Sequence, residues 1–305
     1  MQEDIFSLIQ KEIDEFNAGL RKNTSSEILE FKSVLDYIFE TKGKQIRPIL
    51  GVLCSKIFGE FNLEQNLFLQ GVELVHNATL FHDDVIDNSK TRRGKISLQE
   101  KFSNKMAILT GDYFLSSAIK IINKIENQLI YDFFAACMKE ICEGEIEQNF
   151  SLNKILSIDE YIHKTRRKTA LLFALAAKGC VILSSNTDDN LVESMEKFGE
   201  NFGILFQIKD DINNFKKSED KPFYNDMKDG IYTAPLIFLS EKFPQISQML
   251  INKDFDSVIK LLNNSNAIEQ SENLAKKYYT KAKKNLEVLP DNQYKKALLN
   301  LLSKL

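Results

Sequence analysis

The chain has 305 residues, of which 43% are hydrophobic, so it is long enough to bury a sizeable core. Its formal net charge is −3, and 27% of its residues are charged. Nucleic-acid-binding proteins usually carry a basic bias, which this chain lacks, so the composition predicts no nucleic-acid partner.

The cysteines and the apolar runs predict the compartment. Four cysteines, at positions 54, 137, 142 and 180, form no CxxC pair and stand in apolar stretches. We therefore expect buried thiols in a reducing compartment and no zinc site. The first ten residues are acidic and amphipathic, unlike a secretory signal, and no apolar run approaches the roughly 20 residues that span a bilayer. We predict a cytoplasmic protein without a transmembrane segment.

Apolar residues recur at spacings of three and four along almost the whole chain, and the counts of glycine (12) and proline (5) are low. This pattern is typical of helices. The predicted helices cover residues 3–20, 25–40, 46–58, 64–89, 104–122, 127–150, 158–184, 190–216 and 231–242, with Asp188 or Asp189 as the N-cap of the eighth. Helical spacing continues after residue 252, and no linker or repeat divides the chain. We predict an all-α fold with one domain over residues 1–305.

A first acidic cluster stands near the end of the predicted helix 64–89. His76, Asp83 and Asp87 are seven and four residues apart, so they share one stripe of that helix. Apolar neighbours surround the acids, and clustered negative charge there is costly unless cations neutralise it. Oxygen ligands without nearby nitrogen or sulfur ligands favour Mg²⁺, which also accepts phosphate oxygens. A solvated acidic face is the alternative.

Basic residues follow the first cluster directly. Arg92 and Arg93 precede Gly94, and the planar donors of arginine match phosphate oxygens. Earlier in the chain, Lys44 and Arg47 stand at a predicted loop-to-helix junction, where backbone amides and cations together hold an anion. The alternatives without a bound anion are a surface arginine pair at Arg92 and Arg93, and an ordinary basic first turn at Lys44 and Arg47.

A second polar stripe interrupts the apolar helix predicted at 190–216. Gln207, Asp210 or Asp211, and Asn214 share one face. A buried structural network is one interpretation. The other is that this cluster faces the first one across several divalent cations, which implies a polyanionic ligand, most simply a diphosphate. Lys168 and Thr169 lie in the predicted helix 158–184, and a lysine whose amine reaches water is the simpler interpretation there.

These motifs together resemble the trans-prenyl diphosphate synthases, most closely the long-chain, octaprenyl type. The likeness runs from about residue 42 to residue 235, in the order of the family. The matching segments are GKQIRP at 43–48, HNATLFHDDVID at 76–87 with RRG at 92–94, KT at 168–169, FQIKDD at 206–211, and Lys221 with Asp226. The resemblance implies a helical bundle of the isoprenoid synthase type around a central active-site cavity.

The resemblance also implies roles for individual residues. Isopentenyl diphosphate would be bound by Lys44, Arg47, His76 and Arg93. Mg²⁺, three ions in all, would be ligated by Asp83, Asp87 and Asp210, with Asp84 and Asp211 in support. The allylic diphosphate would contact Arg92, Lys168 and Lys221, with Thr169 and Gln207 at the reaction centre. The family likeness further implies a homodimer, and an apolar product implies peripheral contact with a membrane surface.

The expected activity is condensation of isopentenyl diphosphate with an allylic diphosphate to give a long trans-polyprenyl diphosphate. Small residues, Ala78 and Thr79, stand five and four positions before Asp83, where short-chain enzymes often carry an aromatic. A farnesyl or geranylgeranyl synthase is the nearest alternative, and a terpene cyclase would not need the second diphosphate site. Asn214 and Ile231 replace an aspartate and a lysine common in the family, which leaves open a non-catalytic subunit of a heteromeric synthase.

Overall fold

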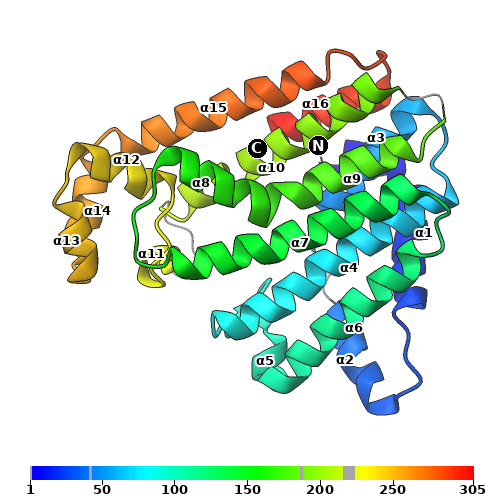
Figure 1. Cartoon of the computed structure of the whole chain (residues 1–305), viewed down its shortest axis with the longest axis horizontal. Coiled ribbons are helices and arrows are strands. Elements are labelled where there is room, and N and C mark those ends of the chain that lie inside the picture. The colour runs from blue at the N-terminus through cyan, green and yellow to red at the C-terminus, as the bar shows by residue number, and fades with distance from the viewer. Residues whose placement is uncertain (1, 41–42, 186–187, 216–223) are drawn as a thin grey trace. The chain divides into compact units, whose positions relative to one another are not determined.

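The computed structural model describes residues 2–40, 43–185, 188–215 and 224–305. Apart from one hairpin of two short strands, these residues form helices, turns and loops (Figure 1). The elements in chain order are α1 (Gln2–Asn23), α2 (Leu29–Glu40), α3 (Ile46–Phe58), α4 (Leu63–Ile86), β1 (Thr91–Arg92), β2 (Lys95–Ile96), α5 (Leu98–Lys101), α6 (Asn104–Ile122), α7 (Gln128–Phe150), α8 (Ile158–Thr165), η1 (Arg166–Ala170), α9 (Leu171–Ile182), α10 (Asp189–Asn213), α11 (Asn225–Lys228), α12 (Ala234–Lys242), α13 (Ile246–Ile251), α14 (Phe255–Asn263), α15 (Ala267–Asn285) and α16 (Gln293–Ser303).

The all-α prediction is confirmed, and each predicted helical range contains observed helix, although the helices predicted to begin at residues 25 and 231 begin at Leu29 and Ala234. Three further differences concern a π-turn, a hairpin and the end of a helix. The predicted helix 158–184 is interrupted by a π-helical turn, η1, and the polar stretch after α4 folds into the β1–β2 hairpin. The helix predicted to reach residue 216 ends at Asn213. The expected N-cap is present, because the Asp188 carboxylate accepts a hydrogen bond of 2.8 Å from the Leu191 amide.

The chain folds into two compact units. Unit 1 comprises Met1–Ala136, Leu175–Glu196 and Val288–Leu301; unit 2 comprises Cys137–Ala174, Lys197–Glu287 and Leu302–Leu305. Four of the five divisions fall inside helices α7, α9, α10 and α16, and the fifth lies between α15 and α16. The organisation of residues 1–305 as one domain therefore remains a prediction.

Helix α4 is the central element of unit 1. It begins with a capping box, in which the Asn62 and Gln65 side chains each bond the other's backbone amide. Its apolar face packs against α6, which runs beside it in Figure 1, and against α1 and α3. Phe68 is fully buried, and a Cβ at Gly179 would lie only 2.1 Å from its ring. The close packing of α4 fixes the position of the residues at its carboxyl end.

In unit 2, α12 contacts α8, α13, α14 and α15 around a small apolar core. The buried members of that core are Met227, Tyr232, Leu236, Leu239, Ile246, Leu250, Val258, Leu262 and Ala267. Beyond residue 252 the chain is helical, as its spacing predicted, and Ala275, Tyr278 and Ala282 of α15 are buried.

The thiol prediction was wrong at one position. Cys54, Cys137 and Cys180 are buried, but Cys142, on α7, is exposed. Within the part of the chain that the structure describes, no helix combines the length and apolar character needed to cross a membrane.

Candidate active site

The first acidic cluster lies at the carboxyl end of α4. Asp83 is half-buried in the last turn, and Asp87 is the exposed C-cap, with its amide 2.8 Å from the Asp83 carbonyl oxygen. The negative end of the helix dipole disfavours carboxylates at this position. The two carboxylates therefore favour a bound cation at this end of the helix.

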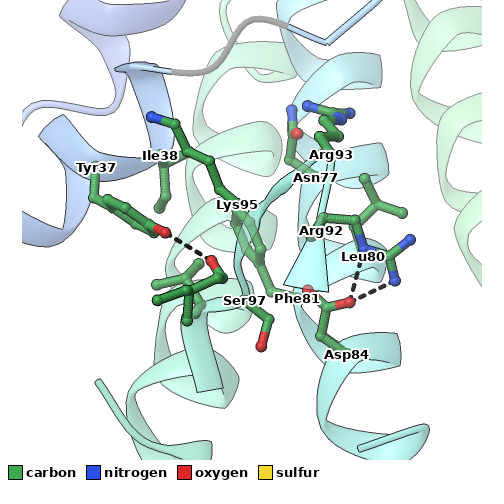
Figure 2. Close-up of a pocket in the computed structure, with 12 residues that line it drawn as sticks. Tyr37, Ile38, Asn77, Leu80, Phe81, Asp84, Arg92, Arg93, Lys95 and Ser97 are labelled. Carbon is green, nitrogen blue, oxygen red and sulfur yellow. Dashed lines mark hydrogen bonds and ion pairs between the residues drawn. The ribbon is translucent and has the colours of Figure 1, made fainter. Parts of the chain in front are cut away.

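Arg92 supplies one such cation. Its Nε donates to Oδ1 of Asp84 at 2.8 Å, and Nη2 donates to the same oxygen at 2.5 Å (Figure 2). Asp84 is 1% exposed, and burial raises the pKa of its carboxyl group while Arg92 opposes that rise. The pair ties the β1–β2 hairpin to α4.

The hairpin turn explains the Arg-Arg-Gly motif. Arg92 pairs with Lys95 across the hairpin, and the two residues between them, Arg93 and Gly94, have φ values of 53° and 74°. Two successive residues with positive φ form a type I′ turn, which matches the twist of a two-residue hairpin. A non-glycine residue at positive φ is strained, so the position of Arg93 is maintained by the fold around it.

The turn brings Arg93 against the start of α3. A Cβ at Gly43 would lie 2.6 Å from the Arg93 guanidinium carbon, so only glycine leaves space there for that group. Gln45 has a φ of 50° and precedes the first turn of α3, in which Arg47 lies. Lys44 is exposed beside them.

Arg47, His76 and Arg93 share one electrostatic neighbourhood, which also contains Glu73. Burial and the charges of Arg47 and Arg93 hold the pKa of the His76 imidazole well below its ordinary value, so the ring is neutral near pH 7. Burial also raises the pKa of the Glu73 carboxyl group, and the two guanidinium groups oppose this rise. Burial lowers the pKa of Arg47 to about 10, which leaves it charged at neutral pH. The cluster is thus cationic and suited to an anion.

A small cavity of about 60 Å³ lies behind the arginine pair, between α2, α4 and the hairpin (Figure 2). The Tyr37 hydroxyl closes one side by donating to the Ile96 carbonyl at 2.7 Å. Such a volume holds about two waters. Among the described residues, no hydrogen-bond partner reaches the buried Ser97 hydroxyl in its wall, which a water would satisfy. The cavity is too small for an isoprenoid chain, and the residues around it support the hairpin.

In unit 2, Lys168 and Thr169 lie in the π-helical turn η1. The Lys168 amine is 2.7 Å from the Glu145 carboxylate. A Cβ at Gly144 would lie 2.7 Å from Cβ of Arg167, so glycine lets α7 approach the turn closely. Arg166 and Arg167 pair with further acids of α7 and α10, at Glu140, Glu143, Glu147 and Glu200. A π-turn inside a helix is rare and often marks a functional position.

The second acidic cluster lies at the carboxyl end of α10. Asp210 is half-buried, whereas Asp211 is 1% exposed and accepts hydrogen bonds from Tyr161 Oη (2.5 Å) and Gln207 Nε2 (2.7 Å). Burial raises the pKa of Asp211 to about 7, against the effect of these two hydrogen bonds. The sequence left a buried structural network and contact with metal ions as two interpretations of this cluster, and for Asp211 the protein itself supplies the partners. Thr169 donates to Gln207 Oε1 at 2.9 Å, so these two residues lie together, and their role at the reaction centre stays a prediction.

Asn214 and Asp226 extend this cluster. Asn214 Nδ2 donates to Asp226 Oδ2 at 2.5 Å. Burial raises the pKa of Asp226, and the nearby charge of Asp210 raises it further. An aspartate at 214 would add another negative charge, so the neutral amide found here relieves repulsion. Lys221 lies outside the described residues.

The donors in both clusters fit Mg²⁺. Among the described residues, no three His, Cys, Asp or Glu side chains come together closely enough to hold a metal ion by themselves. Mg²⁺ commonly binds through one or two carboxylates and completes its shell with water and substrate phosphates. Asp83 with Asp87, and Asp210 near Asp226, are sets of this kind, and the repulsion at Asp226 is what a divalent cation relieves.

Comparison with known proteins assigns the family. The family model described as polyprenyl synthetase matches residues 29–268. The chain belongs to the polyprenyl synthetase family. This result confirms the resemblance drawn from the motifs and the assignment to the prenyltransferases.

Named relatives extend the comparison. The chain is 35% identical to the decaprenyl-diphosphate synthase of Dictyostelium discoideum over 88% of its length, and spans 60% of that longer protein. It is 31% identical to the chloroplastic solanesyl diphosphate synthase 2 of Arabidopsis thaliana, over 98% of this chain and 75% of the relative. The crystal structure of a polyprenyl synthase from Caulobacter crescentus, complexed with calcium and isoprenyl diphosphate, has a TM-score of 0.92 and 25% identity, covering 99% of this chain and 96% of that one.

Three residues of these clusters, Glu73, Tyr161 and Lys164, were not predicted from the sequence. Glu73 stands three residues before His76 in an apolar run, which was a visible signal. Lys164, one turn before Lys168, is half-buried near Asp211 and Asp226, and burial lowers its pKa. Nothing in the sequence distinguishes Tyr161 from an ordinary core tyrosine.

Proposed function

We propose that this protein condenses isopentenyl diphosphate with an allylic diphosphate and so synthesises a long trans-polyprenyl diphosphate. One observation supports this proposal most strongly. Three separate segments of unit 1 bring Arg47, His76 and Arg93 together in one cationic cluster. Family membership supplies the reaction class.

Isopentenyl diphosphate is the ligand that we assign to this cluster. Arg47 and Arg93 provide planar donors for the diphosphate oxygens, and exposed Lys44 adds a positive charge. A neutral His76 donates one N–H without adding charge. Glu73 offsets part of the positive charge and limits where the two guanidinium groups rest.

The allylic diphosphate is assigned to the acidic clusters. Asp83, Asp87 and Asp210 would ligate Mg²⁺, three ions in all, which when bound stabilises negative charge on the departing diphosphate. Arg92 would contact the same diphosphate with the part of its guanidinium group that Asp84 does not use, and Lys168 and Lys221 would add direct contacts. Asp84 and Asp211, each bonded within its own unit, would position their neighbours.

Thr169 and Gln207 are assigned to the reaction centre. Their oxygen atoms would stabilise the allylic cation left when the diphosphate departs, in a site from which apolar side chains exclude water. The double bond of isopentenyl diphosphate then attacks the cation, and loss of a proton restores a trans alkene. The departed diphosphate is the base that we assign to this last step.

A long product is supported by two observations. The relatives are named for decaprenyl and solanesyl diphosphate, which favours a long chain over a farnesyl or geranylgeranyl product. Ala78 is small, so an aromatic side chain does not block the helix face at this position. We further propose that the enzyme works in the cytoplasm as a homodimer and touches a membrane surface when it releases product.

Product analysis of the purified protein tests the proposal. The protein is incubated with farnesyl diphosphate, labelled isopentenyl diphosphate and Mg²⁺, and the dephosphorylated products are separated by chromatography. We expect Mg²⁺-dependent products longer than 20 carbons. Products that stop at 15 or 20 carbons would assign a short-chain synthase. An inactive protein that becomes active only with a partner would assign a subunit of a heteromeric enzyme, and cyclic products formed without isopentenyl diphosphate would assign a cyclase.

A further inference from the structure

A continuous chain of hydrogen bonds links the core of unit 2 to the residues assigned to the reaction centre. Tyr161 on α8 donates to Oδ2 of Asp211 at 2.5 Å, and Gln207 Nε2 donates to Oδ1 at 2.7 Å. Thr169 in η1 then donates to Gln207 Oε1 at 2.9 Å. Each side-chain polar group in this chain has a specific partner.

The direction of these bonds follows from the acceptor atoms. Oδ1 of Asp211 accepts from Nε2 of Gln207, so the Gln207 NH₂ group faces Asp211 and the Gln207 oxygen faces Thr169. Thr169 consequently donates its only proton to Gln207, and its remaining lone pairs are left for another partner. With the amide reversed, Thr169 would accept from Gln207 and present its proton instead. A proton directed at a carbocation is repulsive, whereas lone pairs are attractive.

The backbone fixes the spacing of this chain. Gly199, Gly203, Gln207 and Asp211 follow one another at intervals of four on α10, so they share one face. A Cβ at Gly203 would lie 2.5 Å from the Ala170 Cα, and one at Gly199 would lie 2.6 Å from the Ala174 Cα. The two glycines therefore hold α10 against η1 and α9, at a distance set by the backbones themselves.

Tyr161 lies at the buried end of the chain. Tyr161 and Asp211 are each 1% exposed, so water cannot easily replace the phenol as the donor to Oδ2. Without the phenol, one oxygen of a buried carboxylate would lose its partner, and Asp211 would turn toward another donor.

We propose that Tyr161 is a positioning residue for the prenyl transfer: through Asp211 it fixes the Gln207 amide, and through Gln207 it fixes the direction in which Thr169 donates its proton. This inference rests on the proposed function, because that function places Thr169 and Gln207 beside the allylic cation. In this proposal Tyr161 does not touch the substrate and acts on Gln207 only through Asp211.

The kinetic test is Tyr161→Phe, with Tyr278→Phe as the matched control. Tyr278 on α15 is a buried tyrosine near Tyr161. In the described residues its hydroxyl bonds neither Asp211 nor Gln207. We expect Tyr161→Phe to lower kcat about tenfold, the equivalent of 1.4 kcal/mol, with KM for isopentenyl diphosphate unchanged, and Tyr278→Phe to leave both unchanged. In a Gln207→Leu background, Tyr161→Phe should have no further effect. An unchanged kcat, or an equal loss in both backgrounds, would overturn the proposal.

A second measurement is independent of activity. In enzyme labelled with [¹⁵N]glutamine, the Gln207 side-chain amide is assigned as the resonance lost in Gln207→Leu. We expect this amide to be protected from exchange with water in the wild-type protein, and the protection to fall at least tenfold in Tyr161→Phe. A wild-type Gln207 amide that exchanges as fast as exposed glutamine amides would refute the network even if Tyr161→Phe did not fold. Protected amide in an enzyme that does not consume isopentenyl diphosphate would instead refute the proposed function.

Discussion

Gly43→Ala should weaken isopentenyl diphosphate binding while the fold stays intact. The added Cβ would lie 2.6 Å from the Arg93 guanidinium carbon and 2.7 Å from Nη1. Ordinary carbon contacts are about 3.5–4.0 Å, so the guanidinium group must move by roughly 1 Å. This group ends a flexible side chain, so the fold loses little. Gly43 does not have a positive φ, and alanine there would restrict the unfolded chain, which stabilises by about 0.4–1 kcal/mol.

The expected effect on binding comes from one displaced charged contact. Such hydrogen bonds contribute about 1.5–3 kcal/mol, which corresponds to a rise of ~10- to 100-fold in KM for isopentenyl diphosphate. Steady-state kinetics measure this rise, and thermal unfolding should show an equal or slightly higher Tm. In an Arg93→Ala background, Gly43→Ala should change KM less than about twofold, because the added Cβ acts by displacing Arg93, so the two changes are coupled and do not add. An unchanged KM in the wild-type background, or a full effect without Arg93, would refute the reasoning.

Three further predictions concern other parts of the clusters. Ala78→Tyr, at a fully buried position of α4, should shorten the product in the farnesyl-primed assay, and an unaltered product distribution would show that this position does not limit chain length. Gly144→Ala should push η1 away from α7 through the contact at Arg167 and lower kcat, while Ala135→Gly, at an exposed position of the same helix, should leave kcat unchanged. Because the folded pKa of His76 is depressed, its NMR resonances should not titrate between pH 8 and 6, and the free energy of unfolding should fall as pH drops below about 6.5, where the unfolded residue gains its proton. A His76 midpoint near 6.5 would contradict this prediction.

The helices and their approximate positions could be predicted from the sequence, because packing against a core imposes a spacing of three and four on apolar residues. The hairpin was not predicted. Its strands have two residues each, too short for an alternating pattern, and its turn carries Arg93 where asparagine or glycine is usual. The π-turn at Lys168 was also unpredictable, because it widens a helix without changing its apolar character.

The predicted site residues differ in how far the structure connects them. Arg47, His76 and Arg93 share one cluster, and Thr169 bonds Gln207, whereas the roles of these residues in binding and catalysis stay predictions. The sequence could not distinguish the roles of adjacent aspartates. Burial separates them: Asp211 is enclosed and bonded to Tyr161, whereas its neighbour Asp210 is half-buried. A partner that lies 50 residues away along the chain leaves no local signal.

Anomalous diffraction from crystals grown with Mn²⁺ and an unreactive thiolo-analogue of an allylic diphosphate would test the metal assignment most directly. We predict manganese peaks within about 2.2 Å of carboxylate oxygens of Asp83 and Asp87, and a further peak at Asp210, with the diphosphate oxygens completing each shell. A bound diphosphate with no manganese at these three aspartates would contradict the proposed chemistry.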